Sequence, residues 1–221
     1  MRRLIAGFVV TIVFVAILLI SAGRADYWQA WAYGVISAAM NFCTYVILKR
    51  NPQVAAERAK IGEGSKTWDK VLLGLGLLLT LITLVLAGLD CGRFHSGAQL
   101  PSGSFVFGAV LTILGAAMFL SAMNENRFFS AAVRIQAERG HSVCSSGLYR
   151  IVRHPGYSGM IVGTIGLPLL LASAWSCIPA FLSVLLLIVR TRLEDRTLAE
   201  ELPGYRGYQQ STPYRLMPGV W

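Results

Sequence analysis

The sequence predicts an all-α integral membrane protein with about six transmembrane helices, and five as the alternative. The 221 residues are 55% hydrophobic and only 14% charged, with a mean hydropathy of +0.57, whereas soluble domains carry roughly a quarter charged residues. Several runs reach the roughly 20 apolar residues that a bilayer-spanning helix needs. The basic residues gather in alternate loops, which is typical of multi-pass membrane proteins.

Four apolar runs come first along the chain. They cover residues 4–20, 28–48, 71–89 and 105–123. The first run, between MRR and SAGRAD, resembles a signal peptide but is long for one, so we expect it to be retained as an anchor. Residues 1–123 therefore form a predicted N-terminal unit of four spans, and residues 124–221 form a second unit.

The fifth apolar stretch, residues 160–189, is 30 residues long. A single helix of that length would measure about 45 Å, against a hydrocarbon core of about 30 Å. Pro168 and the small residues ASAWS at 172–176 interrupt the stretch. The pattern predicts a helical hairpin of two short spans.

The distribution of basic residues predicts the orientation. With six spans, 18 of the 20 Lys and Arg residues fall on one side, and only Arg24 and Arg93 fall on the other. Basic loops stay in the cytoplasm, so both termini are expected there, in a bacterial or archaeal cell membrane. We therefore expect the basic residues behind the net charge of +9 to set the membrane topology and to contact lipid headgroups, not to bind nucleic acid. The oligomeric state stays open.

Polar chemistry is concentrated after residue 124. The four cysteines are scattered without metal-ligand spacing, so neither a metal site nor a disulfide is expected. In residues 126–143, arginines alternate with Phe and Val, which suits a helix that lies in the interface or extends the fourth span and ends at Gly140. An ordinary amphipathic connector is the preferred interpretation.

Residues 147–159 read GLYRIVRHPGYSG, directly before the apolar hairpin. Pro155 disfavours helical geometry at His154 and suits the first turn of a helix that begins near Tyr157. The free N–H groups of such a turn attract a carboxylate or phosphate. In the simpler interpretation, the arginines only set the membrane topology and the aromatic residues only lie at the membrane interface.

A third polar segment begins at Arg190, where the last apolar run ends. Arg190 and Glu194 are one helical turn apart, Asp195 follows, and Pro203 ends the predicted helix. A surface ion pair worth a few tenths of a kcal/mol is the simple interpretation. The alternative is that the acidic residues face the basic segments, where they neutralise arginines or bind a cationic ligand.

The ordered motifs GLYRIVRHPGYSG, an apolar hairpin, RTRLED, LPGYRGY and YRLMPGVW resemble the isoprenylcysteine carboxyl methyltransferase family over residues 124–221. The resemblance implies S-adenosylmethionine as cofactor, bound in a cytoplasmic pocket formed by the C-terminal half. It also implies the site residues. Cofactor contacts fall on Gln136, His141, Gly147, Tyr149, Arg153, His154, Pro155, Tyr157, Glu194 and Asp195, and the catalytic roles fall on Arg190 and Glu194. Glu194-Asp195 stands where the family usually has two glutamates.

The resemblance implies methyl transfer to a lipidic or prenylated acceptor, with a carboxylate favoured as in prenylcysteine O-methylation. Arg190 is then expected to bind that carboxylate through two hydrogen bonds. His154 and the N–H groups available among residues 155–158, where Pro155 has none, are expected to hold the cofactor carboxylate. The alternatives are phospholipid amine N-methylation, with Glu194 as base, and an NADPH-dependent sterol or isoprenoid reductase. Transport is disfavoured because no ionisable residue falls deep inside a predicted span.

Overall fold

The computed structural model describes residues 2–59, 64–98 and 100–221, and these residues form helices and loops without a β-strand. The long helices are α1 (Arg2–Ala22), α2 (Trp28–Arg50), α4 (Thr67–Ala87), α5 (Ser104–Glu125), α6 (Pro155–Leu170) and α7 (Cys177–Glu201). The shorter elements are α3 (Pro52–Glu57), the π-helix η1 (Gly88–Phe94), the 3₁₀ turns η2 (Ala137–Arg139) and η3 (Gly147–Arg150), and α8 (Tyr205–Ser211).

Four helices within the described residues are long and apolar enough to cross a membrane. They are Leu4–Ala22, Trp28–Arg50, Thr67–Phe94 and Ser104–Glu125. Their outer faces carry exposed apolar side chains such as Ile20, Val35 and Val106, each more than 60% exposed. Such surfaces suit contact with lipid. The four predicted N-terminal spans are therefore confirmed as helices of the required length and composition.

The apolar stretch 160–189 folds as two helices, α6 and α7, as predicted. Pro168 stays within the last turn of α6, and the chain reverses over residues 171–176. Ala172 has a φ of 57° in this turn, and the Ser173 hydroxyl donates to Oδ2 of Asp90 at 2.7 Å. Whether α6 and α7 are the fifth and sixth spans stays a prediction, because α6 has only 16 residues.

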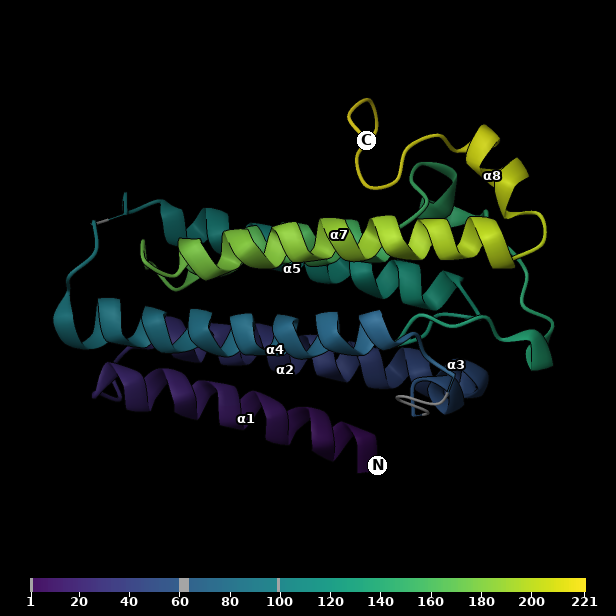
Figure 1. Ribbon diagram of the computed structural model, residues 1–221. Helices are drawn as coiled ribbons and strands as arrows, with labels where there is room; N and C mark the ends of the chain where they lie inside the picture. Colours follow the sequence, from purple (N-terminus) through teal and green to yellow (C-terminus); the bar gives the residue numbers. More distant parts are fainter. Residues whose placement is uncertain (1, 60–63, 99) are drawn as a thin grey trace.

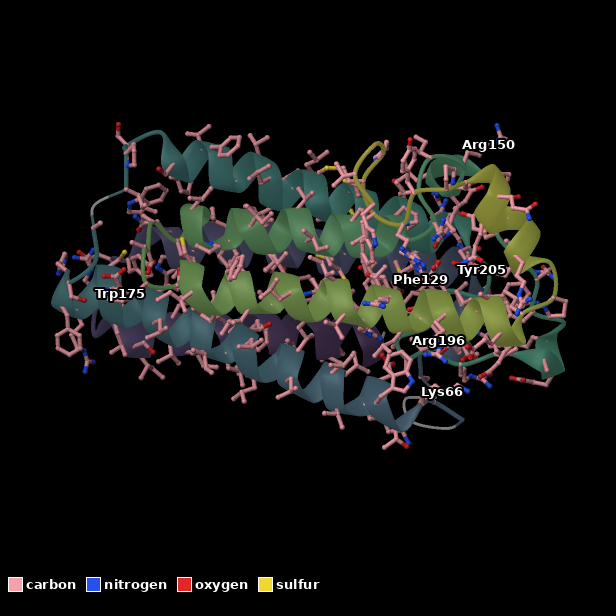
Figure 2. All side chains as sticks on the ribbon, turned by 45° about the horizontal axis from the view of Figure 1, so that its top comes forward. Lys66, Phe129, Arg150, Trp175, Arg196 and Tyr205 are labelled. Carbon is pink, nitrogen blue, oxygen red and sulfur yellow. The ribbon has the colours of Figure 1, made fainter. Side chains whose placement is uncertain are left out.

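The long helices lie side by side, and the N-terminus, α3 and α8 lie toward the same end of the bundle (Figure 1). We call this the polar end. Figure 2 shows Lys66, Phe129, Arg150, Arg196 and Tyr205 near it, and Trp175 of the hairpin turn at the opposite end. The basic loops that are predicted to share one side of the membrane thus share one end of the bundle.

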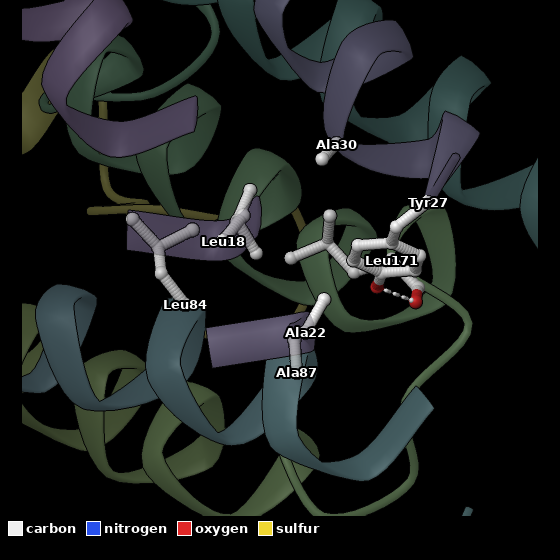
Figure 3. Packing of buried hydrophobic residues seen from close by; sticks show 7 residues of the cluster. All are labelled: Leu18, Ala22, Tyr27, Ala30, Leu84, Ala87 and Leu171. Atoms are coloured by element: carbon white, nitrogen blue, oxygen red, sulfur yellow. Dashed lines mark hydrogen bonds between the residues drawn. The ribbon is translucent and has the colours of Figure 1, made fainter. Parts of the chain in front are cut away.

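A compact apolar cluster closes the end opposite the polar end (Figure 3). It is formed by Leu18, Ala22, Tyr27, Ala30, Leu84, Ala87 and Leu171. The Tyr27 hydroxyl donates a hydrogen bond to the Leu171 carbonyl oxygen at 2.5 Å, which ties α2 to the hairpin turn. The hairpin is therefore anchored at its turn, so that the opposite ends of α6 and α7 are held at the polar end.

Helices α5 and α6 approach each other through glycines. A methyl group added at Gly159 would lie 2.6 Å from the Gly115 carbonyl oxygen, and one added at Gly115 would lie 2.5 Å from the Gly159 carbonyl oxygen. Small residues at such crossings let helix backbones touch, which is typical of helix pairs in membranes. The contact fixes the start of α6, which carries Tyr157 and directly follows His154.

Candidate active site

The polar end contains a cavity of about 330 Å³, within the usual range for small-molecule sites of roughly 300–1,000 Å³. Seven of the predicted site residues line it: His141, Tyr149, Arg153, His154, Tyr157, Arg190 and Glu194. The remaining wall is largely apolar and aromatic, and it includes Leu73 of α4 and Phe119 of α5. The prediction of a pocket formed by the C-terminal half alone is therefore incomplete, because the N-terminal helices also supply wall residues.

Asp195 lies behind the cavity wall and is only 1% exposed. Its Oδ1 accepts hydrogen bonds from Arg153 Nε at 2.8 Å and from the Tyr205 hydroxyl at 2.9 Å. His154 Nε2 lies 3.2 Å from the same oxygen, and Arg215 Nε donates to Oδ2 at 2.8 Å. Burial alone would raise the pKa of Asp195, but the hydrogen bonds from these partners hold it well below its usual range. Asp195 thus organises the wall rather than lining it.

The C-terminal tail completes this network through its backbone. The amides of Arg153 and His154 donate to the carbonyls of Tyr214 and Arg215, each at 2.9 Å. Arg153 Nη1 donates to the carbonyls of Thr212 and Pro213 at 2.7 Å. Arg153 thus makes four side-chain hydrogen bonds, two to the Asp195 carboxylate and two to carbonyls of the tail. Arg153 therefore holds the bend before α6 in place.

Glu194 and Arg190 enter the cavity from the same face of α7, but they do not form the simple ion pair that their spacing allows. The Tyr157 hydroxyl donates to Oε2 of Glu194 at 2.5 Å. Arg190 lies over the ring of Tyr157, 5.2 Å from its centre, and pairs with Asp69 of α4 through Nε at 2.6 Å. Tyr157 thus contacts both the carboxylate of Glu194 and the guanidinium of Arg190.

Residues 126–143 form a connecting segment and not the helix that their alternation of residues suits. The segment is irregular apart from the 3₁₀ turn η2, although Gly140 does end that turn with a φ of 62°. Partners elsewhere replace its helical hydrogen bonds: the Val133 amide donates to Asp69 Oδ2 at 2.8 Å, and its carbonyl accepts from the Lys66 amide at 3.2 Å. The extended path lets Phe128 and Phe129 both line the cavity.

Gln136 and His141 form the end of this segment. Gln136 is fully buried, and its side-chain amide donates to the Phe128 carbonyl at 2.8 Å, so it supports the loop and does not line the cavity. The Gln136 backbone amide donates to Nδ1 of His141 at 3.2 Å. Burial, assisted by Arg139 and Arg134, lowers the pKa of His141 to about 4. His141 is therefore neutral at physiological pH.

Three further predicted residues shape the site without lining it. Gly147 adopts a φ of 53° at the start of η3, where a side chain would be strained and would meet Glu125. Pro155 is the first residue of α6, which begins two residues before Tyr157. Asp195 acts from behind the wall, as described above. The structure thus brings all the predicted residues to the polar end, and it distinguishes those that line the cavity from those that support it.

Glu57, Asp69, Tyr205 and Arg215 are polar residues that hold the site together and were not predicted as site residues from the sequence. Glu57 is 3% exposed and pairs with Arg134 at 2.5 Å, and Asp69 is fully buried. The available signal for Asp69 was an acidic residue at the start of an apolar run, which alone cannot identify its partner. Tyr205 and Arg215 lie beyond the paired acids, in a tail whose path depends on tertiary contacts.

Comparison with known proteins matches residues 108–200 to the isoprenylcysteine carboxyl methyltransferase family. A probable protein-S-isoprenylcysteine O-methyltransferase of Oryza sativa is 35% identical over 79 residues, which cover 35% of this chain and 41% of the relative. Protein-S-isoprenylcysteine O-methyltransferase B of Arabidopsis thaliana is 33% identical over 118 residues, which cover 53% of this chain and 60% of the relative. The cobalt-zinc-cadmium resistance protein CzcN of Cupriavidus metallidurans is 29% identical over 140 residues, which cover 63% of this chain and 61% of the relative.

The chain thus spans between two fifths and about three fifths of the lengths of these relatives. The matched segment 108–200 contains α6 and most of α5 and α7, together with eleven of the predicted site residues. These are the elements that surround the cavity and hold His154, Tyr157 and Glu194 in it. Over this segment, the chain is similar to the isoprenylcysteine carboxyl methyltransferase family.

Proposed function

We propose that this protein is a membrane methyltransferase that uses S-adenosylmethionine and methylates the carboxylate of a prenylated cysteine or a similar lipidic acceptor. One observation carries the proposal. The cavity places His154, Tyr157 and Glu194 against an apolar and aromatic wall, at the end of a bundle with four helices that suit a membrane. Such a site can bind a charged, water-soluble cofactor and a hydrophobic acceptor at the same time.

The residues present fit S-adenosylmethionine by their chemistry. The cofactor combines an adenine ring, a ribose, an amino acid portion and a cationic sulfonium. Phe128, Phe129 and Tyr149 offer aromatic faces, which attract both flat rings and cations. Glu194 offers a carboxylate to a cationic group, and the N–H groups of Gly156 and Tyr157 in the first turn of α6 suit a carboxylate. His154, held by Asp195, would contact the carboxylate of the cofactor's amino acid portion.

When bound, S-adenosylmethionine supplies an electrophilic methyl group on a sulfur that is its own leaving group. The acceptor carboxylate is ionised at neutral pH, so it needs no base. In-line transfer of that methyl group to the acceptor oxygen would leave the electron pair on sulfur, so the chain's own residues would need to bind and orient the two groups. The protein has to align these groups and exclude water, and the apolar wall serves the second need.

Arg190 is the residue that would hold the acceptor carboxylate. Its Nε and Nη2 are engaged by Asp69, and Nη2 also donates to the Ala131 carbonyl at 3.1 Å. Among the described residues, Nη1 has no hydrogen-bond partner, so it is the group left for a ligand. The predicted two-point contact through Nε and Nη2 would require Asp69 to leave. We therefore propose binding through Nη1.

The proposal includes the predicted topology. Six spans, with both termini in the cytoplasm, would place the cavity where cofactor arrives from water and acceptor arrives from the bilayer. Leu73 and Phe119, on helices that suit the membrane, extend the wall toward the apolar part of the bundle. This arrangement accounts for a polar motif directly before an apolar hairpin.

The test is methyl transfer by detergent-purified protein from S-adenosylmethionine with a labelled methyl group. N-acetyl-S-farnesylcysteine and phosphatidylethanolamine in mixed micelles serve as the two acceptors. A methyl ester releases labelled methanol in alkali, whereas an N-methyl group does not, so the product distinguishes the two chemistries. We expect alkali-labile label on the farnesylated acceptor. Label only on the phospholipid would support the amine alternative, with Glu194 as base. Label on neither acceptor, together with retention of NADPH, would support the reductase alternative.

A further inference from the structure

Asp69 connects the N-terminal helices to the cavity. It lies in the first turn of α4, outside the matched segment 108–200, and is fully buried. Its two carboxylate oxygens accept from Nε and Nη2 of Arg190 at 2.6 and 3.2 Å. The second oxygen also accepts from the Val133 amide at 2.8 Å. One carboxylate thus fixes both Arg190 and a wall segment.

Arg190 has two acidic side chains within reach. Glu194 is one helical turn further along α7, at the spacing that favours ion pairs on a helix. Arg190 is nevertheless paired with Asp69, and Glu194 accepts from Tyr157. Because Arg190 is only 6% exposed, its charge needs a buried partner. Without Asp69, the nearest acidic side chain on its own helix face is Glu194.

We propose that Asp69 is a positioning residue for the methyl acceptor, acting through Arg190. By engaging Nε and Nη2, it leaves Nη1 for an acceptor carboxylate and prevents Arg190 from pairing with Glu194. Both cavity residues then stay available for ligands. This inference rests on the proposed function, and it adds a residue from the N-terminal unit to the acceptor site.

Glu57 provides a matched control. Like Asp69, it is a buried carboxylate of the N-terminal unit that anchors residues 130–134, in this case through Arg134 Nε at 2.5 Å and Nη2 at 2.6 Å. Among the described residues, Glu57 pairs with Arg134 and accepts from the Ser130 hydroxyl, whereas Arg190 pairs with Asp69. A loss that arises only from loosening the segment should therefore appear with both Glu57→Gln and Asp69→Asn.

The experiment compares Asp69→Asn, Asp69→Glu, Arg190→Gln, the double variant Asp69→Asn/Arg190→Gln and Glu57→Gln. For each we would measure KM and kcat for N-acetyl-S-farnesylcysteine, together with S-adenosylmethionine affinity by calorimetry. We expect Asp69→Asn to raise the acceptor KM at least about tenfold, as loss of a charge-assisted contact does. Cofactor affinity should change little, and Asp69→Glu should recover part of the loss. In the Arg190→Gln background, Asp69→Asn should add nothing to the acceptor KM.

Three results would overturn the proposal. The first is an acceptor KM that Asp69→Asn leaves unchanged. The second is an increase in acceptor KM that Asp69→Asn also causes in the Arg190→Gln background. The third is a loss of acceptor and cofactor affinity in Asp69→Asn that equals the loss in Glu57→Gln. The double variant carries neither buried charge. Comparing its acceptor KM with that of Arg190→Gln therefore still tests the proposal if Asp69→Asn alone fails to fold. A wild-type protein that binds no S-adenosylmethionine and methylates neither acceptor would instead refute the proposed function, and this inference with it.

Discussion

Arg153 and Asp195, 42 residues apart in the chain, form a buried two-point ion pair. Arg153 Nε and Nη2 donate to the two carboxylate oxygens at 2.8 and 3.1 Å, and the side chains are 4% and 2% exposed. The pair joins the bend before α6 to the end of α7. The two ends of the hairpin that carry Tyr157 and Glu194 are therefore fixed relative to each other.

Replacing Asp195 should destabilise the protein strongly. Asp195→Ala would leave the buried charge of Arg153 without its carboxylate partner, a change that costs about 3–5 kcal/mol. Thermal unfolding in detergent, with and without the substitution, measures the effect. Arg196→Ala is the control, because Arg196 on the same helix is exposed and pairs with exposed Glu200. Its unfolding midpoint should match the wild type. Equal midpoints for Asp195→Ala and Arg196→Ala would show that the network does not hold the site together.

Two glycines of α6 should respond very differently to alanine. A methyl group at Gly159 would meet the Gly115 carbonyl oxygen at 2.6 Å and the Phe119 amide at 2.7 Å, whereas nothing lies within 4 Å of one at Gly163. Gly159→Ala must therefore push α6 away from α5, at a cost of about 1–3 kcal/mol. Gly163→Ala should leave the unfolding midpoint unchanged or slightly raised. If both variants behave alike, the close contact of α5 and α6 is absent in the membrane.

His141 should weaken the fold in mild acid. Its pKa is lowered to about 4 in the folded protein, chiefly by burial, against about 6.5 in an unfolded chain. Between these values the unfolded chain takes up a proton and the folded protein does not, so stability falls as the pH drops from about 6.5 toward 4. Above about pH 6.5 both states are neutral and the group has no effect.

His141→Asn isolates this contribution, because the amide oxygen of asparagine can accept the hydrogen bond that Nδ1 accepts from the Gln136 amide. The unfolding midpoint of each protein is followed from pH 7.5 to 4.5. The difference between the two proteins should grow in favour of the variant as the pH falls. A difference that stays constant with pH would mean that His141 titrates alike in both states.

Tyr157 should act through both its ring and its hydroxyl. Tyr157→Phe keeps the ring under Arg190 and removes the donor to Glu194. Loss of one charge-assisted hydrogen bond predicts a drop in kcat/KM of about tenfold or more. Tyr157→Ala removes the ring as well and should lower it further. Steady-state kinetics with N-acetyl-S-farnesylcysteine distinguish the two. Unchanged kinetics in Tyr157→Phe would place the Glu194 contact outside the reaction.

The helical architecture could largely be predicted from the sequence because it follows from hydropathy and length. The interruption by Pro168 and ASAWS correctly predicts the hairpin, and the ordered motifs around His154 and Glu194 correctly predict which parts of the chain meet at the polar end. These signals are local or periodic, so they survive without tertiary information. The number of spans beyond four and the cytoplasmic orientation stay predictions.

Long-range polar contacts could not be predicted in the same way. Residues 126–143 have the alternation of a surface helix, yet Asp69, Glu57 and the Lys66 backbone hold the segment in an irregular path. Arg190 has a suitable partner one turn away, but it pairs with Asp69, 121 residues earlier. In both cases, buried partners from distant segments outweigh the local pattern, and only the folded structure identifies them.

The central claim is that the cavity at the polar end binds S-adenosylmethionine. The most direct test is a calorimetric titration with S-adenosylmethionine of the detergent-purified wild-type protein and of the Glu194→Gln variant. The variant is used once its unfolding midpoint is shown to equal that of the wild type. The account predicts saturable binding by the wild type that is weakened at least about tenfold in the variant, because a charged partner in the cavity is lost. A well-folded wild-type protein that shows no binding, with or without N-acetyl-S-farnesylcysteine, would contradict it.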